Sequence, residues 1–165
     1  MVELISFCII QVYYKLPIDD GRNPVQYSDA TIAELYGDKN LVSSKEMLKE
    51  MWSREQSYEP LVEHAEQEIS GKFVNISEIG FRFSENQKKF LDKNNINIFF
   101  FGGSTMFGTG VRDEDTIASY VQKYLDTVET DKPVAIFNFG AGYYYSTVER
   151  IQLFKMITGG IKPDN

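Results

Sequence analysis

The sequence contains one cysteine and one histidine in 165 residues, and this scarcity excludes several kinds of site. Cys8 cannot form a disulfide within the chain, and no CxxC motif or Cys/His cluster surrounds it. The sequence therefore predicts no zinc site and no redox pair, and nothing in it implies another metal or a cofactor.

A run of basic residues is also missing. The 17 Lys and Arg residues stand against 24 Asp and Glu residues, which gives a net charge of −7 at pH 7. Proteins that bind nucleic acid usually carry a basic stripe or patch that neutralises phosphates, so nucleic acid is excluded as a partner. The hydrophobic content of 42% and aromatic content of 14% are enough for a buried core.

The chain also lacks a long hydrophobic run. Residues 1–16 are mostly apolar and end in Tyr13, Tyr14 and Lys15, an order typical of the interfacial end of a membrane helix. A full span needs roughly 20 apolar residues, and the basic start and cleavage site of a secretory signal are absent. Two interpretations stay open. One is a truncated membrane anchor, with membrane contact through residues 1–16 and a membrane-anchored or extracytoplasmic location; the other is an amphipathic or core-packing helix.

Residues 17–57 are predicted to form a linker with short helices. Pro, Gly, Asp and Asn interrupt regular structure from Pro17 to Gln26. Helices are expected from about Asp29 to Tyr36 and from about Lys45 to Gln56. The second helix has an apolar stripe on one face that predicts core packing, formed by Met47, Leu48, Met51 and Trp52.

From residue 96 onward, apolar runs alternate with helical patterns. Ile96 to Phe101 (INIFFF) and Val134 to Phe139 (VAIFNF) are rich in β-formers, as expected for strands buried on both faces of a parallel sheet. Helical spacing follows each run, over 113–126 and over 146–158. This order predicts a parallel α/β arrangement in which the two strands are adjacent. Two strands do not make a stable sheet, so we expect the sequence to be cut short.

The helices carry local signals for their ends and faces. Capping-box spacing, Ser-x-x-Glu, occurs at Ser43 with Glu46 and again at Ser146 with Glu149. The helix expected over 113–126 carries apolar residues at helical spacing, namely Ile117, Tyr120, Val121, Tyr124 and Leu125.

The glycine-rich segment Gly102 to Gly110 (GGSTMFGTG) follows the first of these strands directly. In open parallel sheets, ligands bind beyond the carboxyl ends of the strands. A serine there is exposed beside backbone N–H groups that can stabilise an oxyanion, so Ser104 is the candidate nucleophile. A phosphate-binding loop would need lysine in place of Thr109, and neither glycine loop fits the GxGxxG fingerprint. A tight strand-to-helix turn without chemistry is the alternative.

Two blocks of the sequence resemble the SGNH (GDSL-like) hydrolase superfamily. FFFGGSTMFGTGVRDEDTIASYVQKYL looks like its first block in the GGST variant, and VAIFNFGAGYYYSTVERIQLF is similar to its second. GKFVNISEIGFR is similar to the segment that precedes the first block in many bacterial members. The resemblance covers residues 58–165. It implies the amino-terminal part of a flavodoxin-like three-layer α/β fold with a parallel sheet, the SGNH hydrolase fold, incomplete at the carboxyl terminus.

The resemblance also implies a serine esterase or acyltransferase. Ser104 would be the nucleophile, and its own N–H would contribute to the oxyanion hole with donors from Gly140, Gly142 and Tyr143. Tyr143 occupies a position where many relatives have glycine. The implied substrates are small acyl esters, acetyl-type, of carbohydrates or lipid-like molecules, so the expected partner is a small-molecule or glycan ester.

Two parts of the family pattern are absent from this sequence: the third-block Gly-x-Asn-Asp and the later Asp-x-x-His. Without the family's catalytic aspartate and histidine, we expect little activity from the chain as given. The single histidine, His64, lies upstream beside Glu63 and Glu66, where we expect a polar surface and not a catalytic base. The rival interpretation is a non-catalytic glycan-binding or structural α/β module, whose site would be lined by Phe107, Tyr143, Tyr144 and Tyr145.

Overall fold

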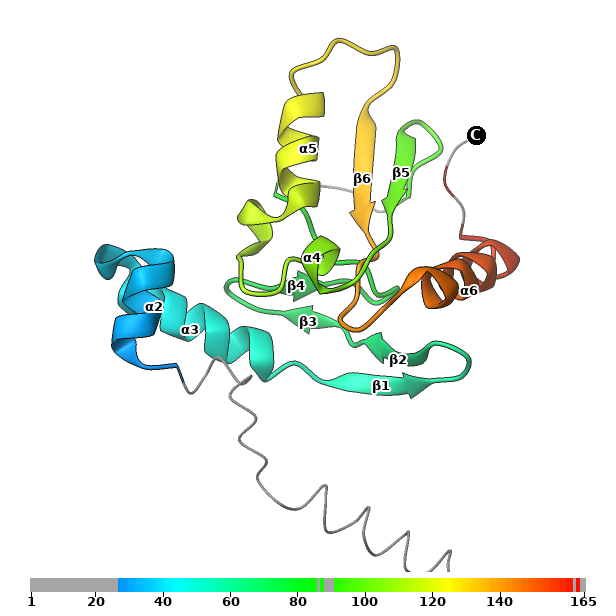
Figure 1. Ribbon diagram of the computed structural model, residues 1–165. Helices are drawn as coiled ribbons and strands as arrows, with labels where there is room; N and C mark the ends of the chain where they lie inside the picture. The colour runs from blue at the N-terminus through cyan, green and yellow to red at the C-terminus, as the bar shows by residue number, and fades with distance from the viewer. Residues whose placement is uncertain (1–26, 86, 88–90, 162, 164–165) are drawn as a thin grey trace, which may run out of the picture.

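The computed structural model describes residues 27–85, 87, 91–161 and 163 (Figure 1). Its helices are α2 (Asp29–Tyr36), α3 (Leu41–Trp52), α4 (Ser104–Phe107), α5 (Ile117–Leu125) and α6 (Ser146–Thr158), with 3-10 turns η2 (Asp38–Asn40) and η3 (Asp113–Asp115). Its strands are β1 (Gln56–Glu59), β2 (Glu63–Glu66), β3 (Ile69–Ser70), β4 (Asn75–Ile76), β5 (Ile96–Phe100) and β6 (Val134–Asn138). The apolar helix predicted at residues 1–16 lies outside the described residues. In the part that is described, no helix is both long enough and apolar enough to cross a bilayer.

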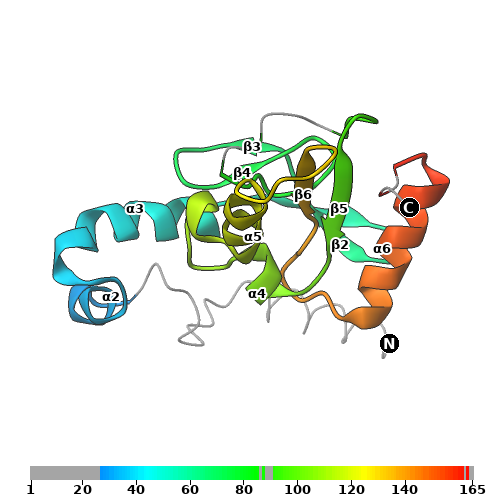
Figure 2. The ribbon, with the colours of Figure 1, turned by 90° about the horizontal axis from the view of Figure 1, so that it is seen from above.

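The two strands predicted from apolar runs form the parallel pair β5–β6. Their register aligns Ile96 with Val134 and Phe100 with Asn138. The prediction that both are buried on both faces is wrong for β5, in which Asn97 is buried, Ile96 is exposed and Ile98 to Phe100 are half-buried. A helix follows each strand, α4 after β5 and α6 after β6. The later helices α5 and α6 lie on opposite sides of the pair (Figures 1 and 2). The prediction of adjacent parallel strands, each followed by a helix, is confirmed.

The strands of the described residues form three two-stranded sheets, of which β5–β6 is the parallel one. β1 pairs with β2, and β3 pairs with β4, both antiparallel. Arg82 connects β4 to β6, because its backbone bridges Ile76 on one side and Asn138 on the other. The fold is therefore mixed α/β with short sheets.

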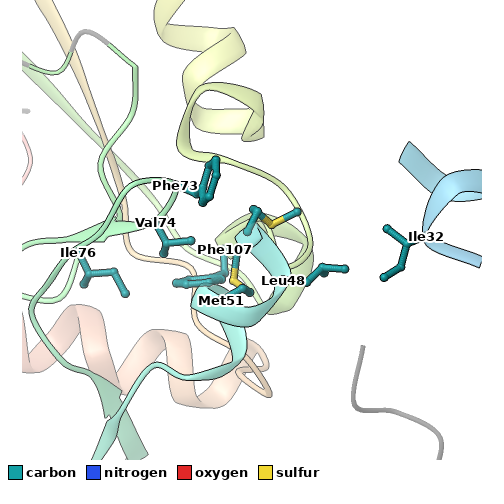
Figure 3. Packing of buried hydrophobic residues seen from close by; sticks show 8 residues of the cluster. Ile32, Leu48, Met51, Phe73, Val74, Ile76 and Phe107 are labelled. Carbon is teal, nitrogen blue, oxygen red and sulfur yellow. The ribbon is translucent and has the colours of Figure 1, made fainter. Parts of the chain in front are cut away.

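Helices α2 and α3 share a hydrophobic core with the segment that carries Ser104 (Figure 3). The buried members of this core are Ile32, Met47, Leu48, Met51, Phe73, Val74, Ile76 and Phe107. Each such side chain contributes about 1.5–3 kcal/mol when it is removed from water. Met47, Leu48 and Met51 are buried as the helical stripe predicted, whereas Trp52 is 40% exposed. Phe107 ends α4, so this core fixes the short helix that begins at Ser104.

The two predicted capping boxes are wrong. α3 begins at Leu41, so Ser43 lies inside its first turn, where its Oγ accepts a hydrogen bond of 2.5 Å from Arg112. α6 has Tyr145 as its N-cap, and no side chain caps that helix. A capping box requires the serine itself to be the N-cap residue, which the spacing alone does not establish.

Helix α5 turns a small and polar side toward the strands. Its buried residues are Ala118, Ser119 and Gln122. The exposed apolar residues of its stripe are Ile117, Tyr120 and Tyr124. Gln122 explains this orientation, because its amide donates to the Val134 carbonyl at 2.9 Å and accepts from the Ile136 N–H at 2.8 Å. The expected helix is present, but most of its apolar stripe does not face the core.

Candidate functional site

Ser104 is the first residue of α4, a short helix that follows the carboxyl end of β5 (Figure 1). Its side chain is exposed. The chain turns sharply before it, and a Cβ added at Gly102 would lie 2.6 Å from the Met106 Cβ, so glycine is required there. The structure thus brings Ser104 to the strand end where the sequence places a nucleophile.

A cleft of about 540 Å³ opens beside Ser104. One wall comes from the loops after β5 and β6 and is formed by Gly103, Ser104, Thr109, Gly142, Tyr143 and Tyr144. The opposite wall comes from the end of α3 and the start of β1 and is formed by Met51, Trp52, Arg54 and Gln56. Sequence reasoning missed this second wall, because an apolar stripe on a helix does not show which other segment it faces.

Backbone N–H groups of the cleft are free to bind a ligand. In the described part of the chain, the N–H groups of Ser104, Gly142 and Tyr143 donate to no other protein atom. They are three of the four oxyanion donors predicted from the sequence. The fourth, Gly140, is buried, and its N–H donates to Asn138 Oδ1 at 3.0 Å. In this conformation Gly140 therefore supports the loop and is not a free donor.

The backbone at Tyr143 is strained. Its φ of 65° lies in the left-handed region, which costs a residue with a side chain about 1–2 kcal/mol. Glycine adopts this conformation freely, whereas a side chain disfavours it. Such strain persists only where the surrounding structure holds the residue in place.

Asn138 joins the two loops of the cleft. Its side chain is fully buried at the end of β6. The Nδ2 group donates to the Met106 carbonyl at 2.8 Å, while Oδ1 accepts the Gly140 N–H. One amide thereby fixes the segment that carries Ser104 against the loop of residues 140–145.

Arg82 holds the far end of the Ser104 segment and is 0% exposed. Its guanidinium donates to the carbonyls of Phe107, Gly108 and Val111 at 3.0, 2.7 and 2.8 Å. Its Nε donates to Asp113 Oδ1 at 2.7 Å. Burial raises the pKa of Asp113, and the charge of Arg82 opposes that rise. The carboxylate therefore depends on Arg82 to stay ionised inside the protein.

The opposite wall contains an ion pair that leaves little net charge in the cleft. Arg54 donates to both carboxylate oxygens of Glu66, at 3.0 and 3.2 Å, and Gln56 donates to the same carboxylate at 2.9 Å. The Arg54 guanidinium also lies 4.3 Å from the centre of the Phe107 ring. Because its charge is matched by Glu66, this wall suits a neutral ligand better than a phosphate.

His64 contacts the 140–145 loop but is not among the residues that line the cleft. Its Nε2 lies 2.7 Å from the Gly142 carbonyl oxygen. A carbonyl only accepts, so Nε2 carries the hydrogen and donates it. The ring packs edge-on against Tyr143 and Tyr144, so the expectation of a polar surface around His64 is wrong.

Tyr144 ties the same loop to β2, because its hydroxyl donates to the His64 carbonyl at 2.5 Å. Burial, with a smaller effect of Glu66, raises the pKa of Tyr144 from 10.0 to about 12. The protonated phenol therefore stabilises the folded state fully below pH 10. That stabilisation is lost as the pH rises toward about 12, because the phenol of the unfolded chain ionises first.

We expect the Tyr144→Phe variant to lack this pH dependence. Between pH 10 and about 12, the free energy of unfolding of the wild-type chain should fall more steeply than that of Tyr144→Phe. Urea unfolding at a series of pH values measures the two slopes. Tyr143→Phe removes an exposed hydroxyl from the neighbouring residue and should keep the wild-type slope. Equal slopes for wild type and Tyr144→Phe would contradict the expectation.

Among the described residues, no three His, Cys, Asp or Glu side chains gather where they could hold a metal ion.

A scan against protein-family models finds no match, and a search of curated proteins finds no significant relative.

Proposed function

We propose that the chain carries the nucleophile and the oxyanion hole of a serine esterase or acyltransferase. The observation that carries the proposal is one cleft that combines the exposed Ser104 hydroxyl with unpaired N–H groups of Ser104, Gly142 and Tyr143. Acyl transfer through a tetrahedral intermediate needs this combination, because preorganised donors stabilise the charge that develops on the carbonyl oxygen.

In the proposed reaction, Ser104 Oγ attacks the ester carbonyl carbon and loses its proton to a base. The carbonyl oxygen becomes an oxyanion that accepts hydrogen bonds from the cleft N–H groups. Collapse of the intermediate breaks the ester C–O bond and leaves the acyl group on Ser104. The leaving oxygen takes up the proton that Ser104 gave to the base and departs as the alcohol. Attack by water or by another alcohol then frees the serine.

The described residues place no imidazole on the Ser104 hydroxyl, since the Nε2–H of the single histidine donates to Gly142. A serine site without its base keeps only about 10³–10⁴-fold acceleration over water, from the oxyanion hole and substrate binding. We therefore propose that this chain alone acylates slowly and turns over little.

The cleft favours a small, neutral acyl ester of a carbohydrate or lipid-like alcohol. Its charged wall is neutralised by the pairing of Arg54 with Glu66. Trp52 and Tyr143 line the cleft and are 40% and 82% exposed, so their rings are open to an apolar or sugar face. The proposal includes a flavodoxin-like three-layer fold, in which β5 and β6 are neighbouring strands and α5 and α6 belong to the outer layers.

Phenylboronic acid tests the proposal at equilibrium. A serine hydroxyl that adds to boron forms a tetrahedral anion, which resembles the intermediate and needs the same N–H donors. We expect ¹¹B NMR to show a tetrahedral adduct with the wild-type chain and none with Ser104→Ala. Thr105→Ala removes the neighbouring exposed hydroxyl and should leave the adduct unchanged.

Two outcomes would overturn the proposal. Boron that stays trigonal with the wild-type chain would show that the cleft does not support a tetrahedral adduct. A tetrahedral signal that survives in Ser104→Ala would place the reacting group elsewhere. If the chain binds a glycan but forms no boronate adduct, the non-catalytic module is favoured instead. The observation that supports this second function is the lack of a histidine base on Ser104 in the described residues.

A further inference from the structure

The turn end of the β1–β2 hairpin packs against the 140–145 loop, whereas Gln56 at the start of β1 lines the cleft. Val62, between the two strands, is buried with Ala141, Tyr144 and Val148. At the same end of the hairpin, Glu59 forms an ion pair with Lys155 of α6. The hairpin is therefore a fixed support on which β2 can hold the loop.

His64 of β2 contacts three consecutive residues of that loop. Its ring donates to the Gly142 carbonyl at 2.7 Å. The same ring lies edge-on to the Tyr143 and Tyr144 rings, with centres 6.2 and 5.2 Å away. Its backbone carbonyl accepts the Tyr144 hydroxyl. No other residue described here makes polar contacts with this loop from the hairpin.

The hydrogen bond to Gly142 also sets the direction of a cleft donor. The Gly142 carbonyl and the Tyr143 N–H belong to one peptide group, and in a trans peptide they point in opposite directions. Because the carbonyl points toward His64, the Tyr143 N–H points away from β2. Gly142 and Tyr143 line the cleft and His64 does not, so this direction leads to the cleft side of the loop.

We propose that His64 is a positioning residue for the oxyanion hole. By holding the Gly142 carbonyl, it keeps Tyr143 in its left-handed conformation with the N–H available to the substrate oxygen. This inference rests on the proposed function of the cleft. It assigns the single histidine of the chain a role other than general base, since its Nε2–H donates to the Gly142 carbonyl and its side chain does not line the cleft beside Ser104.

Three variants separate positioning from catalysis and from general packing. His64→Gln keeps an N–H donor at a similar distance from the backbone, while His64→Leu keeps the bulk and removes the donor. Glu63→Gln changes the exposed neighbour on β2 and is the control. The readouts are the dissociation constant of phenylboronic acid and the backbone amide NMR resonances of residues 142–144.

We expect His64→Leu to weaken boronate binding about 100-fold, the effect of losing one oxyanion donor, and to shift the three amide resonances. His64→Gln and Glu63→Gln should stay close to wild type in both readouts. Wild-type affinity and resonances in His64→Leu would overturn the inference. A loss of boronate affinity in His64→Gln as large as that in His64→Leu would also overturn the inference. The imidazole would then act in a way that another N–H donor cannot replace.

The two proposals fail in different ways. If the wild-type chain binds no phenylboronic acid, the proposed function fails, and the amide resonances alone decide whether His64 positions the loop. If His64→Leu does not fold, as thermal unfolding would show, His64→Asn takes its place, because its shorter amide does not reach the Gly142 carbonyl. The results expected for His64→Asn, and the results that would contradict the inference, are those given for His64→Leu.

Discussion

Replacing Arg82 by methionine should lower the free energy of unfolding by about 3–5 kcal/mol, the largest loss of stability that we expect from one substitution. The loss is large because the change leaves a buried carboxyl group and three backbone carbonyls without their partner. Without its cation, Asp113 would either stay as an unpaired charge or take up a proton inside the protein, and both cost stability. The carbonyls of Phe107, Gly108 and Val111 would lose their side-chain donor.

Urea unfolding of Arg82→Met measures this loss, and two further variants identify its cause. Arg112→Met is the matched control, because Arg112 is partly exposed, lies 3.8 Å from Glu114 and donates one hydrogen bond to Ser43; we expect a loss of about 1–2 kcal/mol. Adding Asp113→Asn to Arg82→Met should restore part of the stability, because it removes the unpaired charge. A loss in Arg82→Met no larger than in Arg112→Met would contradict the role of Arg82 in holding the Ser104 segment.

The strand pair and the placement of Ser104 could be predicted from the sequence because their signals are local. The runs INIFFF and VAIFNF are apolar except for Asn97 and Asn138, and short runs of β-formers predict strands whatever surrounds them. The glycines before Ser104 mark a turn that a side chain would block. Strand runs and glycine turns depend on residues that are adjacent in the sequence. For this reason the predicted positions of β5, β6 and α4 agree with the structure.

The orientation of α5 could not be predicted from its apolar pattern. Its helical spacing is correct, but burial follows the hydrogen bonds that Gln122 makes with the backbone of β6. A hydrophobic pattern carries no information about such a polar contact. The same limit applies to Gly140, whose engagement with Asn138 depends on a buried side-chain amide.

The second wall of the cleft and the role of His64 arise from contacts between distant segments. His64 meets Gly142 across 78 positions of the chain, and Arg54 meets Phe107 across the hydrophobic core that α3 shares with α4. No spacing rule links these residues. The sequence therefore indicated Ser104 and its loop at the strand end, but not the other residues that line the cleft around them.

Ser104→Ala should abolish covalent acetylation at the cleft, which is the largest functional effect we expect. The donors of the cleft should favour acetyl transfer to Ser104 by about 100-fold over an exposed hydroxyl such as that of Thr105. Hydrolysis with turnover should be no faster in the wild-type chain than in Ser104→Ala, because no imidazole is placed on the hydroxyl in the described residues.

The position of the acetyl group after incubation with p-nitrophenyl acetate tests the central claim most directly. Peptide mapping by mass spectrometry should find an acetyl ester on Ser104 of the wild-type and Thr105→Ala chains, and none within residues 102–110 of Ser104→Ala. Acetyl groups spread over surface lysines and hydroxyls, with no preference for Ser104, would contradict the claim that this cleft is an acyl-transfer site.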